Sequence, residues 1–191
     1  MLAQAYILKY PLGVSKLILA DTFSSMDDLN AAFARMRAAV PESVRAIYER
    51  YEKEGLYKER DRYPPEYQKA VEVAYEPVLI GVRPPAYLID MFEKVASDVY
   101  RTMWGEESEF KVTGTLGEFN VESRLGEIRV PTLVIVGGSD IVTIPVAQKT
   151  ARLIGGSKLE IFQRSRHFPF IEEKERFTEV LRSFILQSQQ K

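Results

Sequence analysis

Three short apolar runs, the first far along the chain from the other two, are the feature that most constrains the fold. They lie near residues 15–20, 132–137 and 159–162. The first two are almost wholly apolar, which is typical of strands buried on both faces of a parallel sheet. A helical pattern, "IPVAQKTARLIG", separates the second run from the third. This alternation of strand and helix predicts an α/β fold with about three parallel strands.

The segment between the first two runs has a different pattern. From about Ser24 to Gly105 the apolar residues recur at helical spacing, with prolines near the expected helix starts and glycines near the ends. We therefore expect a helical subdomain at residues 24–110. It would be inserted into an α/β core made of residues 1–23 and 111–191.

Composition excludes several classes of partner and site. Of 191 residues, 46% are hydrophobic, and the 26 basic and 27 acidic residues leave a formal net charge of -1. Such a balance gives no long-range field that would attract nucleic acid or anionic lipid. No apolar run is long enough to cross a bilayer and no secretory signal is recognisable, so we expect a cytoplasmic protein with no membrane partner. The lack of cysteine and the single histidine exclude thiolate chemistry and a histidine-rich metal site, and no cofactor is implied.

Two loops carry residues that could act together. Asp140 follows the second apolar run and a glycine pair, and His167 follows the third run. The carboxyl ends of strands are where open α/β sheets gather their functional groups. An aspartate that accepts the Nδ1 proton of a histidine orients the ring and stabilises the imidazolium formed when the histidine deprotonates a nucleophile. The sequence therefore predicts an acid–base pair at Asp140 and His167.

Each residue of this pair also has a simpler interpretation. An aspartate after glycines is often a turn former or a helix N-cap, and a histidine in a polar loop is often only solvated. The order of the two residues favours the catalytic interpretation. Aspartate and then histidine are the last two members of the triad in α/β-hydrolases, where they follow a serine on a G-x-S-x-G turn.

Four stretches of the sequence resemble proline iminopeptidases, serine aminopeptidases of the α/β-hydrolase fold that remove amino-terminal proline from peptides. The stretches are "MLAQAYILKYP", "VYRTMWGEESEFKVTGTLGEF", "IRVPTLVIVGGSDIVTIP" and "SRHFPF". The resemblance extends over essentially the whole chain. It implies a partial α/β-hydrolase fold with a helical cap at 24–110, and it makes Asp140 and His167 the acid and base of a triad.

The resemblance also implies that the nucleophile is missing. In the family a G-x-S-x-G-G motif runs directly into a segment like "MLAQ", so we expect the chain to begin just after the serine. No G-x-S-x-G occurs in the sequence, and Ser24, Ser25 and Ser139 are not assigned as nucleophiles. The strand at 15–20 would then be an open edge that pairs with a second copy of the chain or with a complementing amino-terminal chain.

Residues for substrate binding follow from the same resemblance. In the family, glutamates of the cap and loops hold the α-ammonium group of the substrate; Glu109 in "SEFKVTG" matches the cap position. Trp104 and Tyr100 could form the wall of a proline pocket. The simpler interpretations are a solvated acid and ordinary helix packing. Ile141 stands where the family commonly has a second glutamate, which weakens the expected clamp on the amino terminus.

Three functions remain open from the sequence. The first is a proline iminopeptidase-like serine hydrolase acting on peptides, inactive as this chain alone because the nucleophile is missing. The second is another α/β-hydrolase, such as an esterase or lipase-like enzyme with a small amide or ester substrate. The third is a non-catalytic remnant that serves as a binding or oligomerising module.

Overall fold

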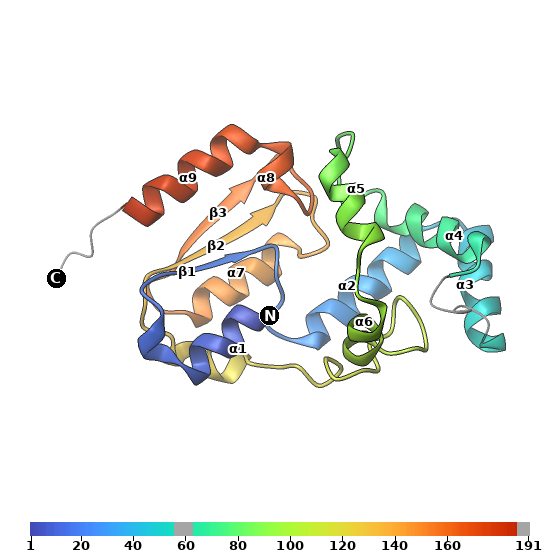
Figure 1. Ribbon diagram of the computed structural model, residues 1–191, viewed down its shortest axis with the longest axis horizontal. Helices are drawn as coiled ribbons and strands as arrows, with labels where there is room; N and C mark the ends of the chain where they lie inside the picture. The colour runs from blue at the N-terminus through green and yellow to red at the C-terminus, as the bar shows by residue number, and fades with distance from the viewer. Residues whose placement is uncertain (56–62, 187–191) are drawn as a thin grey trace. The chain divides into compact units, whose positions relative to one another are not determined.

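The computed structural model describes residues 1–55 and 63–186, which divide into two compact units (Figure 1). The first unit contains the sheet and the second contains the inserted helices. The sheet unit consists of Met1–Ser25, Val78–Gly81 and the described residues from Asn120 onward, and the helical unit consists of the described parts of Met26–Pro77 and Val82–Phe119.

This division differs from the expected one at three segments. Residues 24–25 and 78–81 belong to the sheet unit although the sequence pattern places them in the insertion, and residues 111–119 belong to the helical unit. Residues 56–62 and 187–191 of the expected domains lie outside the described residues.

The sheet has three parallel strands in the order β1-β2-β3. The strands are β1 (Leu17–Ala20), β2 (Thr132–Gly137) and β3 (Lys158–Phe162). In the register of β1 and β2, Leu17 is the partner of Thr132. Every residue of β2 is buried, as expected for a central strand. The predicted α/β class and the three parallel strands are confirmed; β1 begins at Leu17 instead of residue 15, and β3 at Lys158 instead of residue 159.

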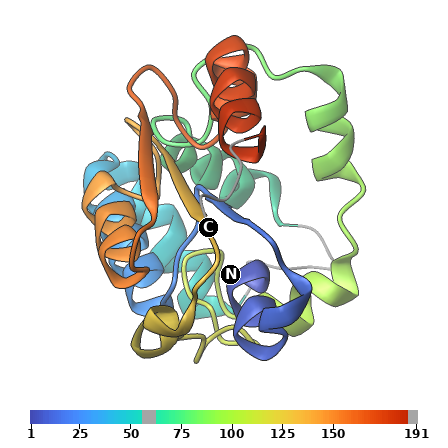
Figure 2. The same ribbon diagram turned by 90° about the vertical axis from the view of Figure 1, so that its left-hand side faces the viewer.

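Helices cover both faces of this sheet (Figures 1 and 2). They are α1 (Leu2–Lys9), α7 (Ile144–Leu153), α8 (Pro169–Glu172) and α9 (Lys174–Leu186), with the 3₁₀ helices η1 (Pro11–Gly13) and η2 (Glu122–Glu127). Side chains alternate between the faces of a strand. Leu17 and Leu19 of β1 accordingly pack toward α1 and η2, whereas Ile18 packs toward α9.

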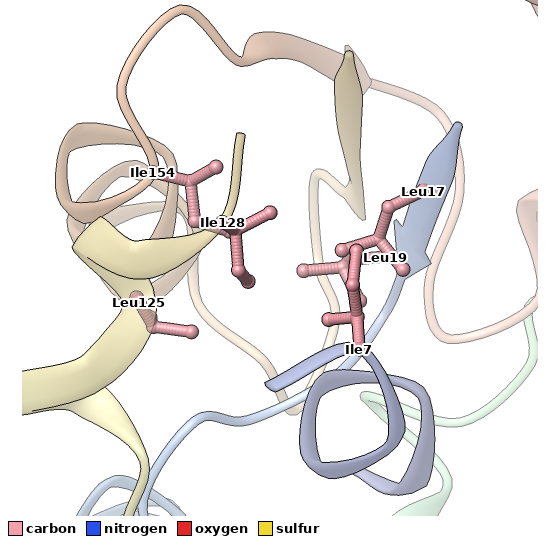
Figure 3. Close-up of a cluster of buried hydrophobic side chains, with 6 residues drawn as sticks. All are labelled: Ile7, Leu17, Leu19, Leu125, Ile128 and Ile154. Carbon is pink, nitrogen blue, oxygen red and sulfur yellow. The ribbon is translucent and has the colours of Figure 1, made fainter. Parts of the chain in front are cut away.

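Six buried side chains form the hydrophobic cluster that anchors α1 to the sheet (Figure 3). Ile7 lies in α1, Leu17 and Leu19 lie in β1, and Leu125 lies in η2. Ile128 and Ile154 directly follow η2 and α7. Full burial of one such side chain contributes about 1.5–3 kcal/mol relative to leaving it in water. The cluster therefore fixes the helix that precedes β1, and with it the position of β1 in the sheet.

The helical unit packs around aromatic side chains. Its helices are α2 (Met26–Ala39), α3 (Glu42–Glu54), α4 (Pro65–Tyr75), α5 (Ala86–Glu93) and α6 (Ser97–Trp104). The rings of Phe33 and Phe110 pack edge to face with their centroids 5.6 Å apart. The centroids of Tyr48 and Phe110 are 5.0 Å apart. Such pairs add about 0.5–1.5 kcal/mol beyond the area they bury. Within the described residues, every helix is too short or too polar to cross a bilayer.

The segment after α6 folds back onto the end of that helix. The N–H groups of Thr113 and Gly114 donate to the Trp104 carbonyl at 2.8 and 2.9 Å, which satisfies a carbonyl that the helix leaves open. A Cβ atom on Gly114 would lie 2.5 Å from the Met103 carbonyl oxygen, closer than real Cβ atoms come. Glycine in the "TGTLG" stretch is thus required by a close backbone approach.

Replacement of Leu19 with alanine tests the cluster in Figure 3. Leu19 is only 2% exposed, so its truncation leaves a cavity. We therefore expect the free energy of unfolding to fall by about 2–5 kcal/mol. Leu12→Ala is the matched control, since Leu12 is fully exposed and its truncation should change stability by less than about 0.5 kcal/mol. Urea unfolding followed by circular dichroism measures both variants, and equal effects would contradict the packing described here.

Candidate active site

Asp140 and His167 lie together beyond the carboxyl ends of β2 and β3. His167 Nδ1 is 2.7 Å from Oδ1 of Asp140, and the same oxygen accepts the N–H of Val142 at 3.1 Å. The Asp140 side chain is fully buried, whereas that of His167 is 27% exposed. Because a carboxylate oxygen only accepts, Nδ1 carries the proton and Nε2 is left as the nitrogen that can take one. The structure thus brings together the two residues that the sequence paired.

The glycine pair before Asp140 allows the loop after β2 to touch the loop after β3. A Cβ atom on Gly137 would lie 1.8 Å from the Arg166 carbonyl oxygen, and one on Gly138 would lie 2.7 Å from that of Gln163. The N–H of Gly138 donates to the Phe162 carbonyl at 2.8 Å. Any larger residue at either position would push the two loops apart and lengthen the Asp140–His167 contact.

Two glutamates at the end of α8 hold the histidine loop from its other side. Oε2 of Glu172 accepts the N–H of Arg166 at 2.8 Å, and Oε2 of Glu173 accepts the hydroxyl of Ser165 at 2.8 Å. Glu173 is buried, which makes its hydrogen bonds stronger than they would be in water. These hydrogen bonds fix the loop around His167 and not only the His167 side chain.

Residues 78–81 add a third support to this loop. The N–H of His167 donates to the Leu79 carbonyl at 3.1 Å, and Oε1 of Glu172 accepts the N–H of Gly81 at 2.7 Å. These backbone contacts explain why the segment belongs to the sheet unit. The sequence pattern could not indicate this, because the segment directly continues a helical stretch.

Asp21, which the sequence analysis did not assign to the site, lies beside Asp140. It follows β1 directly, and its side chain forms a hydrogen bond with that of Asp140. Its Oδ1 atom accepts the N–H of Gly137 at 3.1 Å. Burial, and then the hydrogen bond and charge of Asp140, raise the pKa of Asp21 far above its usual range. The sequence contains one indication that Asp21 belongs to the site: it follows an apolar strand, as Asp140 does.

The three serines considered above have structural surroundings of their own. Ser24 is fully buried, with Oγ 3.1 Å from Oγ1 of Thr150. Ser25 is also buried and forms a β-bridge with Asn120, and Ser139 is exposed in the loop before Asp140.

Glu109 accepts hydrogen bonds from three tyrosines within the helical unit. The Tyr75 hydroxyl donates to Oε1 at 3.1 Å, and the hydroxyls of Tyr100, at 3.0 Å, and Tyr63 donate to Oε2. Burial, and then the Glu109 carboxylate, raise the pKa of each of these tyrosines above its usual value. The phenols therefore remain neutral donors, and the carboxylate is held in one orientation.

The three residues predicted to bind substrate, Glu109, Tyr100 and Trp104, contact one another. Trp104 stacks on Tyr100 with ring centroids 5.6 Å apart, and its Nε1–H donates to the Glu109 carbonyl at 3.0 Å. Tyr63 and Tyr75 were missed. They lie at the start and the end of the tyrosine-rich stretch "YPPEYQKAVEVAY", where ordinary packing is the simplest interpretation of an aromatic residue.

Gly137→Ala tests the contact between the two loops. We expect it to destabilise the chain by about 1–3 kcal/mol and to shift the NMR signals of His167, which are unambiguous because the chain has a single histidine. Gly155→Ala is the matched control, because nothing lies within 4 Å of its added Cβ and its φ is not positive. If Gly137→Ala left the His167 signals in place, the loops would not depend on this approach.

Known proteins are similar to this chain over almost its whole length. No family model matches the chain. It is 34% identical over 185 residues to the proline iminopeptidase of Saccharolobus solfataricus, an alignment that covers 96% of this chain and 58% of the relative.

Two solved structures agree with this relationship. The crystal structure of VinJ is 30% identical with a TM-score of 0.85, and the alignment covers 97% of this chain and 62% of that chain. The proline iminopeptidase of Mycobacterium smegmatis is 29% identical with a TM-score of 0.80, and the alignment covers 97% of this chain and 61% of that chain. The chain thus spans about three fifths of the length of the proteins that it matches. The chain therefore has the α/β-hydrolase fold, and it is similar to proline iminopeptidases in sequence and in fold.

Proposed function

We propose that the chain is the carboxyl-terminal portion of a serine hydrolase that releases amino-terminal residues, proline among them, from peptides. The observation that carries this proposal is the 2.7 Å contact between His167 Nδ1 and the buried Oδ1 of Asp140, at the carboxyl edge of a parallel sheet. A buried carboxylate that fixes the ring leaves Nε2 ready to act as a general base. The relatives named proline iminopeptidase support the substrate class.

In this proposal His167 takes the proton from a serine hydroxyl as the hydroxyl attacks the scissile carbonyl. Asp140 stabilises the imidazolium that forms, and His167 then gives the same proton to the leaving amine. The serine would come from a segment that this sequence does not contain, carried on a strand that pairs with β1. Within the described residues, β1 has a strand partner on one side only, which is compatible with such pairing.

Glu109 supports the preference for a free amino terminus. A carboxylate oriented by three phenols can accept a charge-assisted hydrogen bond from an α-ammonium group. The stacked rings of Tyr100 and Trp104 offer an apolar surface, and aromatic faces also attract cations. We therefore propose that Glu109 binds the ammonium group and that Tyr100 and Trp104 contact the proline ring.

A second candidate function has support at Ile141. This residue follows Asp140 directly and is buried, so an apolar side chain occupies the position where the family commonly has a glutamate. An α/β-hydrolase acting on small amides or esters without a free amino group would be compatible with that change. The non-catalytic module and the cytoplasmic location remain predictions.

Reconstitution tests the proposed hydrolase. We expect the 191-residue chain alone to show no hydrolysis of prolyl-naphthylamide and no labelling by a fluorophosphonate, because it has a base but no G-x-S-x-G serine. A separately expressed segment that carries a family-type G-x-S-x-G-G turn and its preceding strands should pair with β1 and restore both. His167→Ala should then lower the restored rate by about 10³-fold or more.

The same experiment separates the alternatives. A dimer of this chain that excludes the added segment would favour the oligomerising module. Restored turnover that survives His167→Ala would contradict the assigned base, and labelling of one of this chain's own serines would contradict the missing nucleophile.

Glu109→Gln tests the ammonium site in the reconstituted enzyme. We expect kcat/KM for prolyl-naphthylamide to fall about 10- to 100-fold, the effect of losing a charged hydrogen-bond partner, while hydrolysis of naphthyl acetate stays unchanged. Glu107→Gln is the matched control, because Glu107 is exposed and pairs with Lys111. Equal losses on both substrates would show that Glu109 is structural, and no loss on either would leave the esterase as the better function.

A further inference from the structure

The two carboxylate oxygens of Asp140 differ in the number of hydrogen bonds that they accept. Oδ1 accepts from His167 and from the N–H of Val142. Oδ2 is buried, and no N–H or hydroxyl group among the described residues donates to it. A buried carboxylate oxygen without a donor is destabilising, and native structures rarely leave one. The Oδ2 atom therefore requires a donor of another kind, such as the O–H of a protonated carboxyl group.

The carboxyl group of Asp21 is placed to be that donor. Its side chain is in hydrogen-bond contact with that of Asp140, and its Oδ1 atom is held by the N–H of Gly137 at 3.1 Å. The backbone of Asp21 has a φ of 48°, the only positive φ outside glycine in the described part of the chain. Aspartate tolerates this conformation better than most residues, and strained residues concentrate at functional sites. Two carboxyl groups this close hold one proton between them.

We infer that Asp21 is a positioning residue: a neutral carboxylic acid whose O–H donates to Oδ2 of Asp140 and so holds that carboxylate against His167. The proton belongs on Asp21 because Asp140 has two donors on Oδ1, whereas Asp21 has one N–H. The charge stays on the carboxyl group with more donors. The location of the proton follows from this geometry alone, and its use in catalysis rests on the proposed function.

The charged groups around Asp21 agree with a neutral side chain. Asp140 and Glu172 both act to raise its pKa, burial acts in the same direction and is the largest cause, and only the Gly137 N–H opposes them. The pKa in the folded chain is thus above the unfolded value of about 3.9, so the stability that Asp21 contributes is complete below about pH 4 and falls as the pH rises.

Asp21→Asn is the conservative variant. Asparagine tolerates the same backbone conformation, its oxygen can accept from Gly137, and its NH₂ group can donate to Asp140 in place of the acid O–H. The infrared difference spectrum of the wild-type chain minus Asp21→Asn at pH 7 should show the carbonyl stretch of a neutral carboxylic acid. A difference spectrum with only ionised carboxylate bands would overturn the inference.

The proton of His167 Nδ1 reports on positioning. Its low-field NMR signal should persist in Asp21→Asn and should be lost through exchange with water in Asp21→Ala, which removes the donor to Asp140. A signal that is unchanged in Asp21→Ala would overturn the positioning role. If Asp21→Ala fails to fold, the signal in Asp21→Asn decides, since its loss there would also contradict the inference.

Thermal unfolding gives a third measurement on the same pair. The Tm of Asp21→Asn relative to the wild-type chain should rise steadily between pH 5 and pH 8, because only the wild-type chain must keep an acid protonated in this range. A difference in Tm that does not change with pH would overturn the neutral acid. None of the three measurements requires turnover, so a failure of the proposed hydrolase and a failure of this inference are distinguishable.

Discussion

The parallel strands of the sheet end at one edge, and this constraint positions the acid–base pair of the candidate active site. Because β1, β2 and β3 lie side by side, the residues that follow them form a row of Asp21, Asp140 and His167 in the order of the strands. Each member contacts the next. In the arrangement that we propose, a neutral acid orients a carboxylate and the carboxylate orients a base.

A row of this kind is useful only if the loops that carry it are fixed. Gly137 supplies one constraint, because its lack of a side chain lets the acid loop touch the histidine loop, and its N–H also binds Asp21. Glu172 supplies another, because it accepts N–H groups from both the histidine loop and residue 81. The same few groups therefore support both the fold and the geometry of the acid–base pair.

The helical unit builds its polar site by a different means. There the donors are phenols, and burial together with the Glu109 carboxylate keeps them neutral. Hydrogen bonds from neutral phenols orient the carboxylate without adding positive charge of their own. A carboxylate oriented in this way suits recognition of an organic ammonium group.

The sequence by itself determined the α/β class, the helical insertion and the pairing of Asp140 with a histidine, because each rests on a local pattern or on the order of residues along the chain. Only the tertiary structure decided the place of residues 78–81, the tyrosines around Glu109 and the contact between Asp21 and Asp140. In the sequence, only its position directly after an apolar run separates Asp21 from an ordinary turn residue. Its partner Gly137 is 116 residues away, and the two meet because parallel pairing places β1 beside β2. Burial and hydrogen bonding act between neighbours in space, which local sequence patterns do not specify.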